Sequence, residues 1–293
     1  MSQPERSQAT LHAARDAAGA THVERRALLS TCVVAAARGA EVIRSFAQQR
    51  GTLEWEEKAR ADFVSAVDRA SEEAIADMVR ARHPDARIVG EELAPELGAL
   101  SGVTFVADPL DGTTNYLHDF PWYCVSIAAL IDGEPVAGAI LNVPTGELFT
   151  ATAGGGARRG GQPITVSRID QPRRALVGTG FPFRGADEVE RYLRVMGEVM
   201  RKVAGLRRPG SAALDLADVA CGRFDAFWEL RLAPWDVAAG ILLVREAGGI
   251  VTDLDGAPAR VRHGGIVAGN PAMHAWMLER LQGVGSLKRE ATD

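Results

Sequence analysis

Hydrophobic residues first recur at regular intervals after about residue 22 of this 293-residue chain. Two segments have spacings of three and four residues, which place side chains on one face of a helix. The first contains Leu28, Cys32, Ala35, Gly39 and Ile43. The second contains Val67, Ala70, Ala74, Ile75, Met78 and Val79. The polar residues Asp62 and Asp68 favour a helix start there, and His83-Pro84 favours its end. We expect two helices before the first strand.

Short apolar runs at residues 87–90 and 102–107 indicate two strands. From residue 122 to residue 152, apolar runs are separated by Asp132-Gly133 and by the tripeptide PTG at residues 144–146, which are typical of tight turns. This segment is predicted to form an antiparallel meander. The three glycines at residues 154–156 are interpreted as a loose turn rather than a nucleotide-binding loop.

Strands and helices are expected to alternate past about residue 171, as in layered α/β structures. The expected strands are residues 175–179, 224–229, 250–252 and 266–268, and the expected helices are 189–200, 211–221, 236–247 and 271–281. We predict an α/β protein with an α+β N-terminal subdomain at residues 23–170 and an α/β C-terminal subdomain at residues 171–282. Residues 1–22 and 283–293 are expected to be flexible tails.

The most informative segment reads DPLDGTTN from residue 108 to residue 115, directly after a predicted strand. Asp108 and Asp111 offer hard oxygen donors of the kind that Mg²⁺ prefers. Gly112 and Thr113 can present backbone N–H groups to an anion. The segment therefore predicts a shared site for a metal ion and a phosphate. The alternative is an aspartate-rich turn in which both carboxylates cap backbone groups.

Two distant segments add further carboxylates. Glu91 and Glu92 follow the strand predicted at residues 87–90, and only one of two adjacent side chains can face the site; a solvated loop is the alternative. Asp236 follows Trp235 and precedes an apolar helical run, where a helix N-cap is the alternative. Gathering such carboxylates without a cation is unfavourable, so their convergence would predict metal ions.

In combination, these segments resemble the inositol monophosphatase family of Mg²⁺-dependent, lithium-sensitive phosphatases over about residues 27–282. The resemblance implies stacked α/β/α/β/α layers, with the metal site between two subdomains and with homodimers as the usual assembly. It also implies two or three Mg²⁺ ions. The first would bind Glu91, Asp108 and the Leu110 carbonyl, the second would bind Asp108, Asp111 and Asp236, and a third would bind Glu91.

The same resemblance assigns further residues. Thr113 would orient or deprotonate the attacking water, with Asp68 behind it and Glu91 as a third catalytic residue. Gly112 and Thr113 would bind phosphate, and Lys58 would lie on a mobile loop. The residues expected to contact substrate are Asp111, Ser211, Ala212 and Glu229. The alternative for Glu229 is an exposed residue at the end of a strand.

Composition excludes several other classes of protein. The net charge of −5 and the isoelectric point near 5.8 argue against a general nucleic-acid-binding protein. The six histidines show no spacing typical of zinc sites, and the three dispersed cysteines favour a reducing compartment over a disulfide framework. Neither a signal peptide nor a membrane span is visible in the sequence. The expected location is cytoplasmic.

The expected activity is Mg²⁺-dependent hydrolysis of a phosphate monoester, with inositol 1-phosphate and water giving myo-inositol and phosphate. Metal activation of water would allow direct in-line attack without a covalent intermediate. Histidinol phosphate, fructose 1,6-bisphosphate and a nucleotide phosphate are alternative substrates for the same chemistry. A regulatory binding protein on the same fold is the non-enzymatic alternative.

Overall fold

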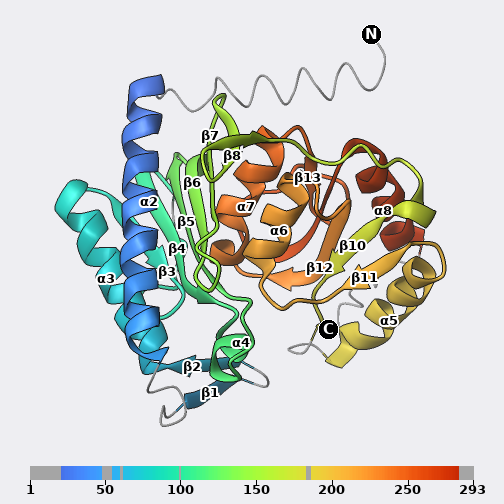
Figure 1. Ribbon diagram of the computed structural model, residues 1–293, viewed down its shortest axis with the longest axis horizontal. Coiled ribbons are helices and arrows are strands. Elements are labelled where there is room, and N and C mark those ends of the chain that lie inside the picture. The colour runs from blue at the N-terminus through green and yellow to red at the C-terminus, as the bar shows by residue number, and fades with distance from the viewer. Residues whose placement is uncertain (1–20, 48–54, 60–61, 99, 183–185, 284–293) are drawn as a thin grey trace, which may run out of the picture.

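The computed structural model describes residues 21–47, 55–59, 62–98, 100–182 and 186–283. Across these residues, helices and sheets alternate in five layers (Figure 1). The outer layers are the helix pair α2 (His22–Ser45) and α3 (Ala66–Arg82) on one side, and the pair α5 (Ala186–Met200) and α8 (Pro271–Gly283) on the other. The central layer contains α6 (Ala212–Ala220) and α7 (Pro234–Glu246). The predicted α/β/α/β/α layering is confirmed.

Two sheets separate the helical layers. The seven-stranded sheet has the order β3-β4-β5-β6-β7-β8-β9 and the strands β3 (Arg87–Gly90), β4 (Val103–Asp111), β5 (Cys124–Ile131), β6 (Glu134–Asn142), β7 (Leu148–Thr152), β8 (Gly156–Arg159) and β9 (Gln162–Ile164). The five-stranded sheet has the order β11-β10-β12-β14-β13 and the strands β10 (Leu176–Thr179), β11 (Gly205–Arg207), β12 (Ala226–Leu232), β13 (Ile250–Thr252) and β14 (Gly264–Gly269). The meander predicted at residues 122–152 is present as β5, β6 and β7.

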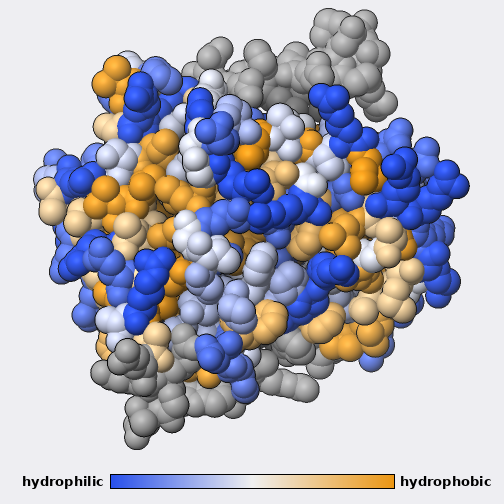
Figure 2. Space-filling view, in the orientation of Figure 1, coloured by the Kyte–Doolittle hydropathy of each residue, from blue (hydrophilic) through white to orange (hydrophobic). Residues whose placement is uncertain are grey.

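Each sheet buries both faces, because helices cover each of them. Along β5, Val125, Ile127 and Ala129 pack in the core with α2 and α3, whereas Ala128 and Leu130 pack in the core with α6 and α7. Helix α7 lies between the two sheets and is apolar nearly all round, as expected for a helix with no solvent-facing side. Figure 2 shows a band of hydrophilic side chains across the middle of one face, beside a hydrophobic area over the α2 half.

The expectation of two helices before any strand is wrong. A hairpin of β1 (Trp55–Ala59) and β2 (Asp62–Ser65) lies between α2 and α3. Asp62 therefore sits on a strand, and Ser65 is the N-cap of α3, with Asp68 in the first turn. The two strands are five and four residues long and pair only with each other in the described structure, and no long apolar run marks them in the sequence.

Strand β4 is also longer than predicted. It continues through Asp111 instead of ending before Asp108. Strands β8, β9 and β11 were not predicted. The tails expected at residues 1–22 and 283–293 fall almost wholly outside the described residues, although α2 starts at His22. Within the described ranges, no helix has the length and apolar character needed to cross a membrane.

Two helical glycines offer a test of the central packing. A Cβ on Gly240 of α7 would lie 2.4 Å from Leu216 Cδ1 on α6, whereas a Cβ on Gly197 of α5 would have no neighbour closer than 3.7 Å. Gly240→Ala should lower the free energy of unfolding by about 1–3 kcal/mol through overpacking. Gly197→Ala should raise it by about 0.5–1 kcal/mol through helix propensity. Urea denaturation measures both values, and equal effects of the two substitutions would contradict the tight α6–α7 contact.

Candidate metal and phosphate site

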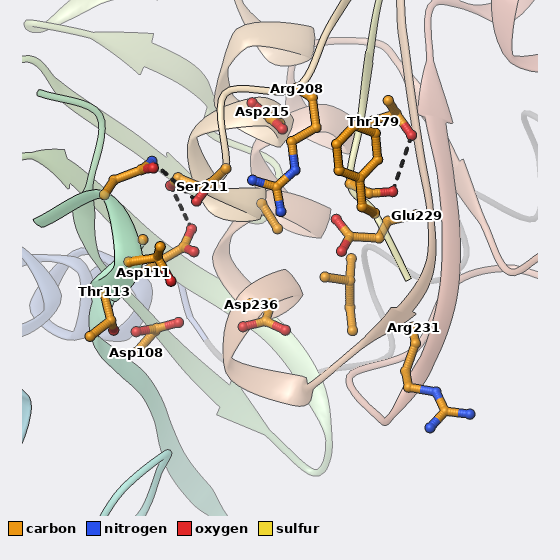
Figure 3. Close-up of a pocket in the computed structure, with 18 of the residues that line it drawn as sticks. Asp108, Asp111, Thr113, Thr179, Arg208, Ser211, Asp215, Glu229, Arg231 and Asp236 are labelled. Atoms are coloured by element: carbon orange, nitrogen blue, oxygen red, sulfur yellow. Dashed lines mark hydrogen bonds between the residues drawn. The ribbon is translucent and has the colours of Figure 1, made fainter. Parts of the chain in front are cut away.

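A cavity of about 340 Å³ opens where the two sheets approach the central helices. Figure 3 shows Asp108, Asp111 and Thr113 on the side of the seven-stranded sheet, Asp236 on the central helix, and Glu229 and Arg231 on the opposite side. The predicted site residues that line this cavity are Glu91, Asp108, Leu110, Asp111, Gly112, Thr113, Ser211, Ala212, Glu229 and Asp236. Asp68 lies behind Thr113, and Lys58 lies on β1 with a side chain outside the described structure.

A β-bulge brings the two aspartates of the loop onto one face of β4. Asp108 is paired with Ser126 and Asp111 with Cys124, so three residue steps on β4 oppose two steps on β5. In a regular strand, residues three apart point to opposite faces. The extra residue of the bulge reverses that alternation and turns both carboxylates toward the central helices.

The other two predicted metal ligands arrive from neighbouring elements. Strand β3 runs parallel to β4 with Gly90 opposite Ala107, so Glu91 leaves β3 beside Asp108. Asp236 is the third residue of α7 rather than its N-cap, which is Ala233. Its Oδ2 accepts a hydrogen bond of 2.7 Å from the Ala233 N–H, so the carboxylate caps the helix from inside the first turn.

Burial and like charge raise the pKa of Asp108 well above its ordinary value. Its side chain is almost completely buried, and Glu91, Asp111 and Asp236 add electrostatic repulsion to the cost of desolvation. Burial also raises the pKa of Asp111, although hydrogen bonds from Ser211 Oγ (2.6 Å) and Ala213 N–H (2.8 Å) oppose that shift. A bound cation would relieve this repulsion.

These oxygen donors suit Mg²⁺ better than a metal ion whose ligands all come from protein side chains. As placed, no group of three or more His, Cys, Asp or Glu side chains in the described ranges could hold a metal ion by itself. Mg²⁺ ordinarily binds one or two carboxylates and completes its shell with water and substrate phosphate oxygens. The carboxylate residues and Leu110 line one open cavity, which meets that requirement.

The relation between Thr113 and Asp68 is present in the structure. Thr113 Oγ1 lies 2.8 Å from Asp68 Oδ1 and 3.0 Å from the Leu110 carbonyl oxygen, but its single proton can be donated to one of them at a time. The other Asp68 oxygen accepts hydrogen bonds from Ser65 N–H (2.8 Å) and Oγ (2.7 Å). Burial raises the pKa of Asp68 despite these bonds.

The loop that follows β4 needs glycine at position 112. Gly112 has a φ of +99°, and a Cβ there would lie 3.0 Å from the Trp122 carbonyl oxygen. The short helix α4 (Thr113–Leu117) follows directly. Asn115 on α4 donates to the Trp122 carbonyl at 2.7 Å and to the Pro209 carbonyl at 2.9 Å, which ties the loop to the segment before α6.

Several residues of the cavity were missed in the sequence. Asp215 of α6 is buried, and its Oδ1 has no hydrogen-bond partner among the residues that the structure describes. Burial, followed by repulsion from Glu229, raises the pKa of Asp215 well above the ordinary value. The guanidinium of Arg208 lies 5.0 Å from the centre of the Phe181 ring at the same end of the cavity. The only available signal was an aspartate within the apolar run of α6.

Comparison with known proteins gives consistent results. A model of the inositol monophosphatase family matches residues 24–286. The Nus factor SuhB of Salmonella typhimurium is 41% identical over 255 residues, which cover 87% of this chain and 96% of that protein. The structure of the extragenic suppressor protein SuhB from Bartonella henselae has a TM-score of 0.83 at 39% identity, covering 87% of this chain and 98% of that one.

The structure of an inositol monophosphatase from Anabaena (Nostoc) sp. PCC 7120 is also similar. Its TM-score is 0.75 at 36% identity, and the match covers 88% of this chain and 96% of that one. The family match includes both sheets and the central helices, because residues 24–286 contain the described elements from β1 to α8.

The raised pKa of Asp108 predicts that, in the metal-free protein, this residue lowers the free energy of unfolding as the pH rises. Below about pH 4, Asp108 is protonated in both the folded and the unfolded state. Above about pH 4, only the folded state keeps this proton. The free energy of unfolding therefore falls with rising pH until the raised pKa of Asp108 is passed. In EDTA at pH 8, Asp108→Asn should therefore raise the free energy of unfolding by about 1–3 kcal/mol, with a smaller gain at pH 4. Urea titrations that show a less stable variant at pH 8 would contradict this electrostatic account.

Proposed function

The chain belongs to the inositol monophosphatase family, and we propose that it is a Mg²⁺-dependent phosphomonoesterase that prefers inositol 1-phosphate. The observation that carries this proposal is the convergence of Glu91, Asp108, Asp111 and Asp236 on one cavity. The bond from Thr113 to Asp68 at the edge of the same cavity supplies a route for a proton. Metal ligands and a water-orienting group therefore lie together, as hydrolysis requires.

Under this proposal, Glu91, Asp108 and the Leu110 carbonyl would hold one Mg²⁺. Asp108, Asp111 and Asp236 would hold another, and Glu91 would also bind a third. Mg²⁺ supplies neutralisation of the phosphate charge and lowers the pKa of bound water. The N–H groups of Gly112 and Thr113 donate hydrogen bonds to phosphate oxygens. Asp111 keeps its orientation because Ser211 and Ala213 both donate to its Oδ2.

Thr113 and Asp68 act on the attacking water. When Thr113 donates its proton to Asp68 rather than to the Leu110 carbonyl, a lone pair of Oγ1 can accept a water proton. The raised pKa of Asp68 suits it to share or take up that proton. The water oxygen forms the new bond to phosphorus, the ester P–O bond breaks, and the leaving alkoxide takes a proton from solvent.

The far end of the cavity favours a polyol as the leaving alcohol. Glu229 and Asp215 bring carboxylate oxygens to this end, and carboxylates accept hydrogen bonds from neighbouring hydroxyl groups. Arg208 and Arg231 also line the cavity, and the charge of Arg231 is partly neutralised because its Nε lies 3.4 Å from Glu188 Oε2. A second phosphate on the substrate would meet these carboxylates, so fructose 1,6-bisphosphate and nucleotide bisphosphates are expected to be poorer substrates than inositol 1-phosphate.

Homodimer formation, a cytoplasmic location and inhibition by Li⁺ are proposed as well, since all three are usual in this family. The three cysteines are free thiols, which suits a reducing compartment. A non-enzymatic role is a second candidate, because the 41% identical relative is named a Nus factor. The complete carboxylate set favours an enzyme, and an intact cavity leaves the outer surface available for a binding partner.

The first test is a panel of phosphate esters. Phosphate release from inositol 1-phosphate should require Mg²⁺ and exceed release from histidinol phosphate, fructose 1,6-bisphosphate and 3′-phosphoadenosine 5′-phosphate. Asp108→Asn should abolish turnover of every ester while the circular dichroism spectrum stays unchanged. Preference for another ester would replace the substrate and keep the mechanism. Absence of Mg²⁺-dependent turnover on all four would favour the binding role.

The proton route is tested at Thr113. Thr113→Ala should lower kcat by about 10²-fold or more, because water loses the group that orients it, while Mg²⁺ affinity stays within a few-fold of the original. Thr113→Ser keeps the hydroxyl and should retain activity to within about 10-fold. Steady-state kinetics and calorimetric Mg²⁺ titration give the two quantities. Nearly full kcat in the alanine variant would rule out the role assigned to Thr113.

A further inference from the structure

Three buried polar side chains lie on one face of α3. Asp68, Ser71 and Glu72 follow spacings of three and four residues, and their exposed fractions are 2%, 0% and 1%. Apolar residues such as Val67 and Ile75 occupy the rest of this buried face. The mechanism above uses Asp68 alone, so Ser71 and Glu72 need a separate explanation.

Each of these side chains contacts a different part of the metal site. Asp68 accepts the hydrogen bond from Thr113, and Ser71 Oγ donates to the Pro109 carbonyl at 2.9 Å. Glu72 Oε2 accepts from the Glu92 N–H at 2.7 Å, and its Oε1 accepts from the Leu93 N–H at 3.0 Å. Pro109 lies between two predicted metal ligands, and Glu92 directly follows a third. One helix face therefore holds all the segments that supply ligands from this half of the molecule.

Two glycines leave room for these contacts. A Cβ on Gly90 would lie 2.2 Å from Glu72 Oε1, and a Cβ on Gly39 of α2 would lie 2.8 Å from Ser71 Oγ. Neither glycine has a positive φ, so the backbone conformation does not itself call for glycine at these positions. Close approach of the polar side chains is the constraint that excludes a Cβ there.

Electrostatic repulsion acts on the loop at residues 91–93, so the loop has to be held in place. Glu91, Asp111 and Asp236 all repel the charge of Asp108, and this repulsion would drive the Glu91 segment outward toward solvent when no cation is bound. A buried carboxylate with two backbone N–H donors forms strong charge-assisted hydrogen bonds and resists that displacement. An apolar residue at position 72 would fill the space but could not bind the two N–H groups.

We propose that Glu72 is a positioning residue of the metal site, which fixes residues 91–93 so that the Glu91 carboxylate faces Asp108. Ser71 fixes the loop at Pro109 in the same way. Together with Asp68, these two residues let α3 hold the segments that carry the predicted metal ligands in position. This inference rests on the proposed function, because it concerns the affinity of the site for Mg²⁺.

Calorimetric titration of the full chain with Mg²⁺ tests the proposal directly. Glu72→Gln keeps the size of the side chain but turns an N–H donor toward one of the two backbone donors. It should weaken Mg²⁺ binding by about 10- to 100-fold, the usual effect of removing a residue that orients a metal ligand. Glu73→Gln, on the exposed side of the same helix, is the matched control and should leave the affinity unchanged.

A double-mutant cycle separates positioning from general destabilisation. In a Glu91→Gln background, the ligand that Glu72 positions is already altered, so adding Glu72→Gln should change the remaining Mg²⁺ affinity by less than about two-fold. An equal loss in both backgrounds would mean that Glu72 acts on the fold as a whole and would overturn the proposal. Unchanged affinity in the single variant would overturn it as well.

Gly90→Ala provides a second variant if Glu72→Gln does not fold. The new Cβ would displace the Glu72 carboxylate from the loop without removing its charge, and Mg²⁺ binding should again weaken by about 10-fold or more. Full affinity in folded Gly90→Ala would overturn the proposal. Absence of Mg²⁺ binding in the unsubstituted protein would instead overturn the proposed function, on which this inference rests.

Discussion

Repulsion between the buried Asp108 and the carboxylates around it is the constraint on which the rest of this structure depends. Asp108 is almost fully buried, and Glu91, Asp111 and Asp236 all raise its pKa. Such a cluster would disperse in a flexible chain, so each member has to be held by the surrounding fold. The bulge in β4, the parallel pairing of β3 with β4 and the start of α7 each fix one or two of these side chains.

The layered architecture supplies rigid places for these groups. The carboxylates stand at strand ends and helix starts, where backbone N–H groups are available to hold them. Asp111 is bound by the first turn of α6 and Asp236 by that of α7, while α3 supports the loops from behind. Both sheets and the central helices meet at this cavity. In the proposed function, the leaving alcohol would lie against a different sheet from the phosphate. The predicted metal ligands come from both halves of the chain, since Asp236 belongs to α7.

Much of this arrangement was predictable from the sequence because its signals are local. Short motifs marked the four carboxylates and Gly112. Hydrophobic spacing and turn residues marked the meander and the alternating strands and helices of the C-terminal half. The bulge was not predictable, since it depends on the register of β4 against β5. The hairpin of β1 and β2 was missed because its short strands pair only with each other within the described structure. Glu72 and Asp215 resemble solvent-facing charges on a helix, and only tertiary contacts show that they are buried.

The central claim is that this carboxylate cluster is a divalent-cation site that binds phosphate. Anomalous diffraction from crystals grown with Mn²⁺ and inorganic phosphate would test it most directly. The account predicts anomalous peaks beside Asp108, shared with Asp111 or Asp236, and phosphate on the backbone of Gly112 and Thr113. A cavity without a peak at millimolar Mn²⁺, in which the carboxyl groups hydrogen-bond to one another, would contradict the account.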